Sequence, residues 1–277
     1  MLKIAVWGAA GNMGTRACRR LRENPEYEVI CVEVVAAAVA RLEARGDEPV
    51  PPAAACRIAD VAILAVADRY IRGVAAEMVP RLRPGAMVMM LDPAAAFAEV
   101  LPERSDISYF VTHPTHPPLF NDETDPEARR DYFGAGKAKQ SIVCALVQGP
   151  ECDYARGEAI ARQYFGPILR AHRVTLEQMA MLEPAMSETC GATFIVAMRE
   201  AMEEAIRRGV PREVARDFML GHINVQLAIV FEQIDWKMSE GAYLVIREAM
   251  KRIFQPDWKG VFDREAIRET TRRIVSG

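Results

Sequence analysis

Short apolar runs recur through the first 175 residues, and segments with helical character separate them. Such regular alternation is typical of βαβ units, whose strands form one parallel sheet. Several runs end in Gly, Asp or His, and open α/β sheets bind ligands at the edge formed by the carboxyl ends of their strands. The pattern therefore predicts an α/β domain with a site at that edge. The runs are Lys3–Trp7, Glu28–Val32, Val61–Val66, Met87–Leu91, Ile107–Val111, Ser141–Val147 and, less clearly, Ile168–Val174.

A glycine motif, Gly8-Ala9-Ala10-Gly11-Asn12-Met13-Gly14, follows the first run directly, and a helical pattern starts near Thr15. Glycines let the backbone approach a pyrophosphate, and the N-terminus of the following helix offers it unpaired N–H groups. The motif in this context predicts an N-terminal Rossmann-type parallel sheet domain that binds a dinucleotide. A tight turn without a ligand is the alternative. The expected cofactor-binding residues of the turn are Gly8, Gly11, Asn12, Met13 and Gly14.

Two acidic residues follow later strands of the predicted domain. Glu33 closes the second run, where a carboxylate can accept hydrogen bonds from both ribose hydroxyls of the adenosine half. The same charge repels a 2′-phosphate, so we expect NAD rather than NADP. Asp68 follows the third run, where the chain passes the nicotinamide ribose. A solvated strand end for Glu33 and a helix N-cap for Asp68 are the structural alternatives.

Two of the four histidines of the chain fall in Thr112-His113-Pro114-Thr115-His116-Pro117-Pro118, again at the end of a strand. Prolines stiffen this turn and hold its side chains near the expected position of the nicotinamide. An imidazole there can act as general base while a hydride leaves an alcohol, or can bind a metal. We therefore expect His113 and His116 to be catalytic, although His-x-x-His alone does not establish a metal site.

The character of the sequence changes after about Thr175, where strand-like runs stop and long helical patterns take over. We expect a dinucleotide-binding domain over 1–174 and an all-helical substrate and dimerisation domain over 175–277. One helix is predicted from Pro184 to Arg208. Its stretch Cys190–Met198 is apolar or small all the way round, which suits a helix buried on every side, including against another subunit. This predicts a homodimer.

Carboxylates interrupt the largely apolar start of this helix at Glu183 and Glu188. Burying a carboxylate is costly unless it is paired or used. At 100° per residue Glu188 points about 140° away from Glu183, so only one of them can face the cleft. We favour Glu183 as a catalytic residue, because the adjacent Pro184 suits a helix start or kink at the border of a site. An interface ion pair is the alternative. Glu183 and His116 together are the expected ligands if a divalent metal is used.

Weaker candidates lie elsewhere in the chain. Asn121–Lys139 is polar, contains glycine and is too long for an ordinary connection, so it is a candidate lid over the site. His222 and Asn224 are second-tier site residues, and a satisfied core histidine is the favoured interpretation of His222.

The composition excludes several classes of protein. The formal net charge is −3 with no basic stretch, which disfavours a nucleic-acid partner. The six cysteines form no Cys-x-x-Cys pair and are expected to be reduced thiols, mostly in the core. A first strand within the first eight residues leaves no room for a signal peptide, and no uncharged apolar run reaches the ~18 to 20 residues of a membrane span. We expect a cytoplasmic protein without a membrane partner.

Longer strings of the sequence resemble a family of bacterial NAD-binding proteins that are described as phosphogluconate dehydrogenase C-terminal-domain-like. The resemblance covers nearly the whole chain. Prephenate dehydrogenases, with a His-Pro at the corresponding strand end, and pyrroline-carboxylate reductases, with similar helical dimerisation domains, are more distantly similar. The strings that carry the family resemblance are Gly8–Gly14, Leu91–Ala95, Phe110–Pro114, Leu119–Arg130, Arg170–Thr175 and Gly221–Asn224.

What the resemblance implies is an NAD-dependent oxidoreductase that acts on a hydroxyl of a branched sugar acid and couples the oxidation to rearrangement of the carbon skeleton. A divalent metal would assist such a rearrangement by polarising adjacent oxygens. A simple hydroxy-acid or imine dehydrogenase of the same fold remains open, as does a non-catalytic NAD-sensing protein. Histidines and a buried carboxylate facing the nicotinamide favour an enzyme.

Overall fold

The structure is a computed structural model that describes all 277 residues, and its internal contacts divide the chain into two units. Unit 1 comprises Met1–Pro184 and Ile267–Gly277, and unit 2 comprises Ala185–Ala266. This division lies ten residues beyond the expected boundary at 174/175 (184 − 174). Unit 1 extends further because helix α7 (Leu176–Ala180) packs on its sheet, and because α11 (Arg264–Ser276) contributes Val275 to its core.

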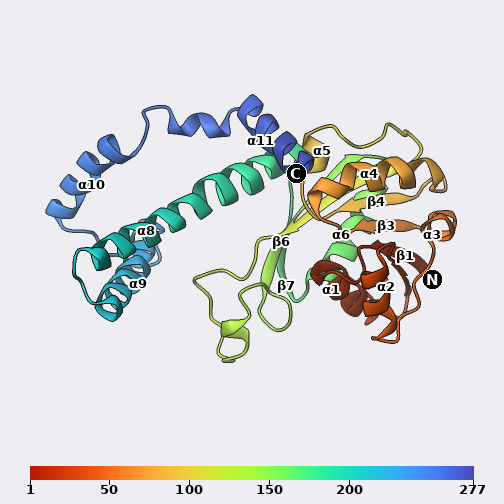
Figure 1. Ribbon diagram of the computed structural model, residues 1–277, viewed down its shortest axis with the longest axis horizontal. Helices are drawn as coiled ribbons and strands as arrows, with labels where there is room; N and C mark the ends of the chain where they lie inside the picture. Colours follow the sequence, from red (N-terminus) through yellow and green to blue (C-terminus); the bar gives the residue numbers. More distant parts are fainter. The chain divides into compact units, whose positions relative to one another are not determined.

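Unit 1 is built on one seven-stranded sheet in the order β2-β1-β3-β4-β5-β6-β7 (Figure 1). All seven expected runs form strands. Strands β1 to β5 are mutually parallel, which confirms the predicted fold class. Strand β6 runs antiparallel to β5, and β7 is parallel to β6. The strands are β1 Leu2–Trp7, β2 Tyr27–Val32, β3 Val61–Leu64, β4 Met87–Met90, β5 Ser108–Pro114, β6 Gln140–Gln148 and β7 Ile168–Arg173.

The reversal at β6 differs from the expected all-parallel sheet and has a local cause. Parallel neighbours need a crossover that carries the chain back to the starting edge, usually a helix. Only a loop with the short 3₁₀ turn η2 (Ala128–Arg130) joins β5 to β6, so β6 starts from the edge at which β5 ends. Helix α6 (Cys152–Phe165) then supplies a crossover, and β7 is parallel to β6.

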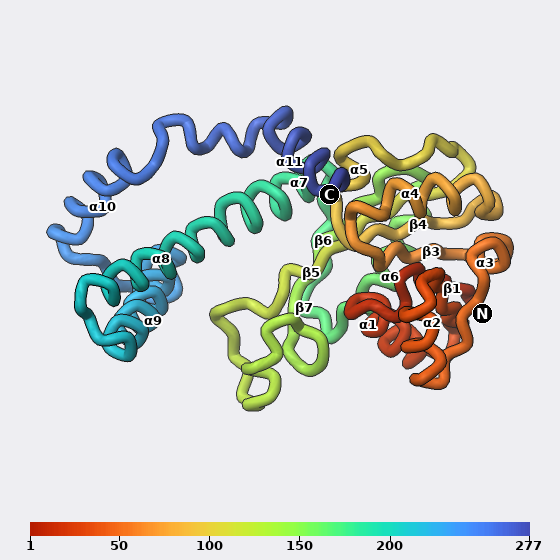
Figure 2. The backbone as a smooth tube through the Cα atoms, viewed as in Figure 1, coloured from red at the N-terminus to blue at the C-terminus, as the bar shows by residue number.

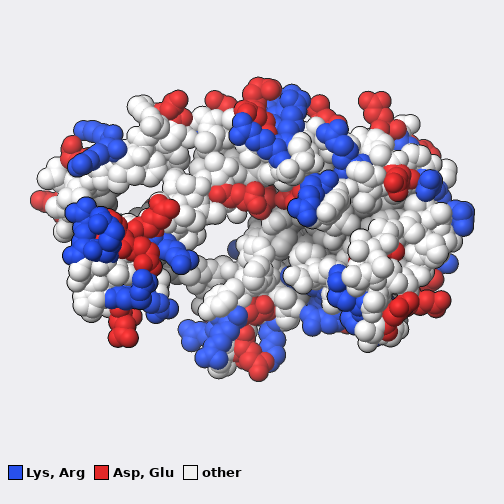
Figure 3. Space-filling view, in the orientation of Figure 1, with Lys and Arg blue, Asp and Glu red and all other residues white.

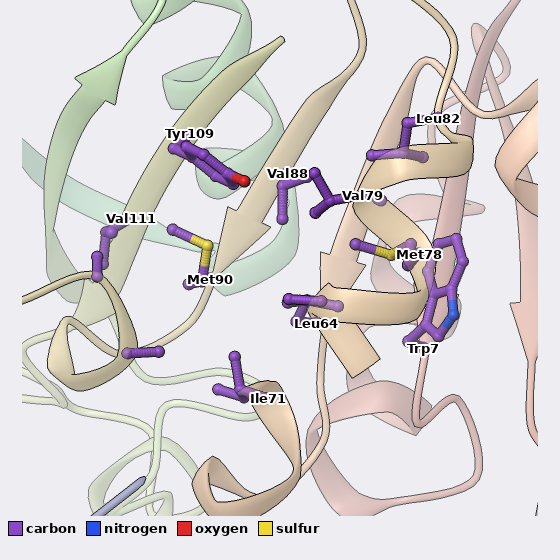
Figure 4. Packing of buried hydrophobic residues seen from close by; sticks show 14 of the residues in the cluster. Trp7, Leu64, Ile71, Met78, Val79, Leu82, Val88, Met90, Tyr109 and Val111 are labelled. Atoms are coloured by element: carbon purple, nitrogen blue, oxygen red, sulfur yellow. The ribbon is translucent and has the colours of Figure 1, made fainter. Parts of the chain in front are cut away.

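Helices cover both faces of the sheet. Alternate side chains of β1 point to opposite faces, with Ile4 and Val6 in one core and Ala5 and Trp7 in the other. Helices α1 and α6 pack on the first face, and α3, α4 and α5 on the second, where Met78 and Leu64 lie beside Trp7 (Figure 4). Burial on both faces explains why these strands are continuous apolar runs. The helical segments before α6 are α1 Asn12–Leu21, α2 Ala36–Glu43, α3 Pro52–Ile58, α4 Asp68–Met78, η1 Val79–Arg81 and α5 Ala94–Phe97.

The long helix expected from Pro184 starts earlier than predicted. Thr175 caps α7 by accepting a hydrogen bond from the backbone N–H of Gln178, whose side chain accepts in turn from the N–H of Thr175. The helical path continues as a π-helix, η3 (Met181–Ala192), with Pro184 inside it, and then as α8 (Thr193–Arg207). Pro184 therefore marks neither the start of the helix nor its end. Widened π-turns of this kind occur frequently at functional sites.

Unit 2 is helical and leaves most of its apolar side chains exposed. In α8, α9 and α10 only Ala215 is buried. An aromatic cluster of Phe194, Phe254 and Trp258 forms part of its packing, with ring centroids 5.5–5.9 Å apart. Within the single chain Ile195 is 68% exposed, so the stretch expected to be buried on every side is not buried by its own chain. Besides α8, the segments of unit 2 are α9 Arg212–Val230, α10 Glu240–Ile253 and η4 Trp258–Phe262.

The surface and the cysteines agree with the composition. Acidic and basic side chains are interspersed over the face drawn in Figure 3. No helix combines the length and apolar character required to cross a membrane. All six cysteines are free thiols, and all but Cys152 are buried.

Candidate active site

The glycine motif forms a tight turn between β1 and α1. Gly8 has a φ of +79°, and a Cβ atom on it would lie 2.5 Å from the carbonyl oxygen of Ala65. A Cβ atom on Gly14 would overlap the carbonyl oxygen of Gly8. Gly11 is the N-cap of α1 and supplies no side-chain cap, so the first N–H groups of the helix, at Asn12 and Met13, have no side-chain acceptor there. The turn can therefore receive an anion such as a pyrophosphate.

Glu33 lies beside this turn, because β2 is the neighbour of β1. Its Oε1 accepts a hydrogen bond of 2.7 Å from the backbone N–H of Ala10. A largely apolar pocket opens next to it at the point where the strand order reverses, between β1 and β3, and open α/β sheets bind ligands at that point. Helices α3 and α4 supply part of this lining, which the sequence did not reveal. The pocket is lined by Trp7, Gly8, Val32, Glu33, Val34, Pro52, Cys56, Val66, Val74, Glu77, Met78 and Arg81.

His113 lies near the end of β5 and faces two carboxylates. Its Nε2 is 3.7 Å from Oε1 of Glu183, in the π-helical segment. Asp92, two residues after the end of β4, completes the group: one ligand atom from each of Asp92, His113 and Glu183 lies within 4.8 Å of the others. Three separate parts of unit 1 thus bring an imidazole and two carboxylates together.

The hydrogen bonds at this cluster fix its chemistry further. Nδ1 of His113 lies 2.8 Å from the carbonyl oxygen of Pro114. In the neutral tautomer Nδ1–H donates to that carbonyl, and the lone pair of Nε2 is directed toward the carboxylates. A lone pair facing carboxylates is unfavourable unless a proton or a cation lies between them. One imidazole nitrogen and two carboxylates are a donor set that fits a divalent cation.

His116 lies outside this cluster, so the ligand set differs from the expected pair of His116 and Glu183. β5 continues through Pro114, which keeps His113 on the strand, whereas His116 lies beyond it with a φ of +60°. The ring of His116 is edge-on to both His113 and Phe133, at centroid distances of 6.1 and 5.8 Å. Burial lowers the pKa of His116; the carbonyl of Phe133 opposes this, and the charges of His113 and Arg16 add to it. The neutral imidazole therefore predominates at pH 7.

Asp68 is the first residue of α4, at the same edge of the sheet as His113. The N-cap position belongs to Ala67 and carries no side-chain hydrogen bond, so Asp68 does not act as the cap. Burial raises the pKa of the Asp68 carboxyl, while its own backbone N–H and the field of His113 act in the opposite direction. Asp68 thus belongs to the electrostatic surroundings of His113.

The second-tier candidates lie elsewhere. Glu188 and Ser187 are exposed, so of the two glutamates considered only Glu183 joins the cluster. His222 and Asn224 are exposed residues of α9 in unit 2. Nδ1 of His222 lies 2.8 Å from the carbonyl oxygen of Phe218, and the two rings stack at 3.9 Å. Within the single chain His222 therefore lies on the surface of unit 2, with its Nδ1 near an acceptor, and not in its core.

Asp92 is the cluster residue that was not singled out from the sequence. A signal was present, because Asp92 follows β4 as Asp68 follows β3, and both places belong to the ligand-binding edge. Its carboxylate also accepts a hydrogen bond of 2.6 Å from the backbone N–H of Ala94, which fixes its orientation.

Comparison with known proteins places the chain among relatives of similar length. The family model described as phosphogluconate dehydrogenase (decarboxylating) C-terminal domain matches residues 121–275. A curated D-apionate oxidoisomerase of Cupriavidus necator is 52% identical over 274 residues, 99% of each chain. That of Rhizobium rhizogenes is 49% identical over 276 residues, 99% of this chain and 100% of the relative.

The chain belongs to the family with the phosphogluconate dehydrogenase C-terminal domain, together with these curated relatives. The resemblance inferred from the sequence is thereby confirmed. Among solved structures, one from C. necator is described as a semialdehyde dehydrogenase NAD-binding protein in complex with calcium and NAD. It is 52% identical, superposes with a TM-score of 0.95 and shares 99% of each chain.

Proposed function

We propose that this chain is a D-apionate oxidoisomerase, which oxidises a hydroxyl of a branched sugar acid with NAD and rearranges the carbon skeleton. The enzyme class agrees with the sequence-based prediction, since the curated relatives are oxidoisomerases and the solved relative binds NAD. The chain is an NAD-dependent oxidoreductase. The observation that carries the proposal is the Asp92–His113–Glu183 cluster, which stands at the same sheet edge as the dinucleotide turn.

The turn residues and Glu33 are the proposed cofactor site. N–H groups at Asn12 and Met13 suit the pyrophosphate, and Gly8, Gly11 and Gly14 leave it room. The carboxylate of Glu33 suits the ribose diol and repels a 2′-phosphate. Bound NAD supplies the hydride acceptor. Asp68, near His113, would lie on the nicotinamide side of the site.

We propose that His116 accepts the substrate proton and that His113 and the two carboxylates bind a cation. The neutral form of His116 predominates at pH 7, so its ring can take the proton of a substrate hydroxyl as the hydride leaves. The carbonyl oxygen of Pro114 orients the ring of His113, so that its Nε2 faces the carboxylates of Asp92 and Glu183. A divalent cation bound by Asp92, His113 and Glu183 would polarise neighbouring oxygens of a hydroxy acid or of the ketone formed from it. The calcium of the solved relative supports the use of a cation.

Unit 2 is the proposed dimerisation element. Its helices bury almost nothing within the chain, and large apolar side chains left exposed are typical of interfaces. A second copy of the chain would cover it in a homodimer. The exposed side chains include Ile195, Val196, Met198, Val214, Phe218, Leu220, Val230, Phe231, Ile234, Trp236, Tyr243, Leu244, Val245, Ile246, Met250 and Ile253.

A substrate panel tests the proposal. The purified protein is supplied with NAD and either a divalent cation or a chelator, and NADH formation is followed at 340 nm with branched and linear sugar acids. D-apionate should give the highest kcat/KM of the panel. Faster turnover of a linear hydroxy acid would indicate a simple dehydrogenase. NADH binding without turnover of any acid would indicate a non-catalytic NAD-binding protein.

A further inference from the structure

The long loop between β5 and β6 (Figure 2) contains Asn121–Lys139, a segment with its own internal hydrogen bonds. The carboxylate of Asp131 accepts hydrogen bonds from four consecutive backbone N–H groups, at residues 135–138, over 2.8–3.2 Å. This closes 131–138 into a compact turn. The position of this turn on unit 1 then depends on contacts with residues outside the loop.

The outer support comes from arginines of helix α1. Arg16, only 8% exposed, donates hydrogen bonds to the carbonyl oxygens of Phe133 and Gly134 in the loop and of Phe165 in α6. Its guanidinium also lies 5.3 Å from the centroid of the Phe165 ring. Arg19 adds an exposed hydrogen bond of 2.6 Å to the carbonyl oxygen of Ala135. A buried guanidinium needs acceptors, so the loop carbonyls and Arg16 hold each other in place.

The residue that Arg16 holds in the loop is also the neighbour of His116. Nδ1 of His116 lies 3.4 Å from the carbonyl oxygen of Phe133, which is the oxygen that accepts from Arg16. The Phe133 ring packs edge-on against His116. The φ of +60° at His116 is unfavourable for a residue with a Cβ, and such a conformation persists only when its surroundings enforce it.

We propose that Arg16 is a positioning residue for the substrate side of the site. By fixing the Phe133–Gly134 backbone, it sets the place of the His116 imidazole beside His113. The helix that carries Arg16 also begins at the dinucleotide turn, so one helix supports both halves of the site. The role of His116 in turnover rests on the proposed function, whereas the anchoring of the loop does not. The competing account is that Arg16 only stabilises the packing of α1 against α6.

Two substitutions at Arg16 and one control test this. Arg16→Met removes the charge and the donors but keeps the length of the side chain. Gln140 also donates hydrogen bonds to the carbonyl oxygens of Gly134 and Phe165, at 2.9 and 2.7 Å. The Arg16→Met variant keeps these two hydrogen bonds, so we expect it to fold. Arg16→Lys keeps a charge but loses the planar fork of donors. The control is Arg20→Met, on the same helix, whose side chain pairs with Glu23 on the surface.

The first readout is trypsin cleavage within the loop, followed by mass spectrometry in the presence of NADH. The loop offers Arg129, Arg130, Lys137 and Lys139 as cleavage sites. Arg16→Met should be cut there about tenfold faster than the wild type, because cleavage follows local opening. Arg16→Lys should be intermediate, and Arg20→Met should match the wild type.

The second readout separates cofactor binding from turnover. For Arg16→Met, kcat/KM for D-apionate should fall about 100-fold, because a misplaced reacting group costs that much. The Kd for NADH should change by less than about threefold, since the direct cofactor contacts are untouched. Phe133→Ala, which keeps the backbone carbonyl, should lower kcat/KM while the loop stays resistant to trypsin.

Three results would overturn the proposal. One is a loop in Arg16→Met that is as resistant as in Arg20→Met. Another is a loss of NADH affinity equal to the loss in kcat/KM, which would assign Arg16 to α1 alone. The third is wild-type kinetics in Phe133→Ala, which would break the link to His116. Because proteolysis and NADH binding need no substrate, a wild type inactive on D-apionate would refute the proposed function and leave the anchoring step to be decided by those two measurements.

Discussion

Nε2 of His113 lies 3.7 Å from Oε1 of Glu183, although 70 residues separate the two in the chain (183 − 113). With Asp92 they form a donor set with one nitrogen and two carboxylates. Glu183 therefore lies beside residues that follow or end β4 and β5, and we propose that it serves the site rather than an interface alone.

Glu183→Gln should therefore weaken the binding of a divalent cation. The amide keeps the size of the side chain but loses its charge, and we expect an affinity for Mn²⁺ at least about tenfold lower by calorimetry, because even residues that only support a ligand are worth about 10- to 100-fold. The melting temperature should stay close to that of the wild type. Glu188→Gln, an exposed change in the same helical segment, is the control. Unchanged Mn²⁺ affinity in Glu183→Gln, or a dimer that dissociates with normal turnover, would remove Glu183 from the site.

Glu33 should govern the choice between NAD and NADP. Its carboxylate lies at the glycine turn, and juxtaposed like charges cost several kcal/mol, so the wild type should bind NADH at least ~100-fold more tightly than NADPH. Glu33→Gln should reduce that ratio to about tenfold or less, as measured by fluorescence titration. Glu28→Gln, on strand β2, which Glu33 directly follows, and paired with Lys3, should leave the ratio unchanged. Equal affinity of the wild type for both cofactors would refute this role of Glu33.

The pH dependence of turnover should follow His116. Its pKa lies below the ordinary histidine value, mainly through partial desolvation, so the neutral form that accepts a proton predominates at pH 7 and above. As pH falls through this lowered pKa, kcat/KM should drop by about tenfold per unit. His116→Asn should lower kcat by about 10² to 10⁴-fold and abolish that acid limb.

His172→Ala, an exposed histidine of β7, is the matched control and should leave the pH profile intact. An unchanged acid limb in His116→Asn would assign the proton transfer to another group.

A charged substitution on the exposed apolar surface of unit 2 tests whether this unit forms the dimer interface. Phe218 of α9 is 66% exposed, and Phe218→Lys should convert a dimer into a monomer in analytical ultracentrifugation, because a charge placed in an apolar interface is left without a partner. Tyr70→Lys, a comparable change on the exposed surface of unit 1, should leave the dimer intact. A wild-type protein that sediments as a monomer at micromolar concentration would contradict the proposed homodimer.

The sequence predicted the sheet well because its strands are buried on both faces, and such strands are continuous apolar runs. The glycine turn and Glu33 were predictable because their spacing from the strand ends places them at one edge. The direction of β6 was not predictable from its apolar run, since that run is the same in either direction. The start of the helical path at α7 was signalled in the sequence by the capping pair Thr175 and Gln178.

The metal-type cluster could be predicted only in part. Asp92, His113 and Glu183 come from three separate segments, and their meeting depends on how β4, β5 and the π-helix pack. No helical periodicity predicts a π-helix, because its side-chain spacing differs from that of an α-helix. His113 rather than His116 joins the cluster because β5 extends through Pro114.

The central claim is an oxidation coupled to a skeletal rearrangement, and ¹³C NMR of the product tests it most directly. The protein is incubated with NAD, a divalent cation and uniformly ¹³C-labelled D-apionate, and the ¹³C–¹³C couplings of the product show which carbons are bonded. A rearrangement breaks one carbon–carbon bond and forms another, so we expect NADH in equal amount with a product whose coupling pattern differs from that of D-apionate. NADH with a product that keeps every original carbon–carbon bond, or no NADH at all, would contradict the account.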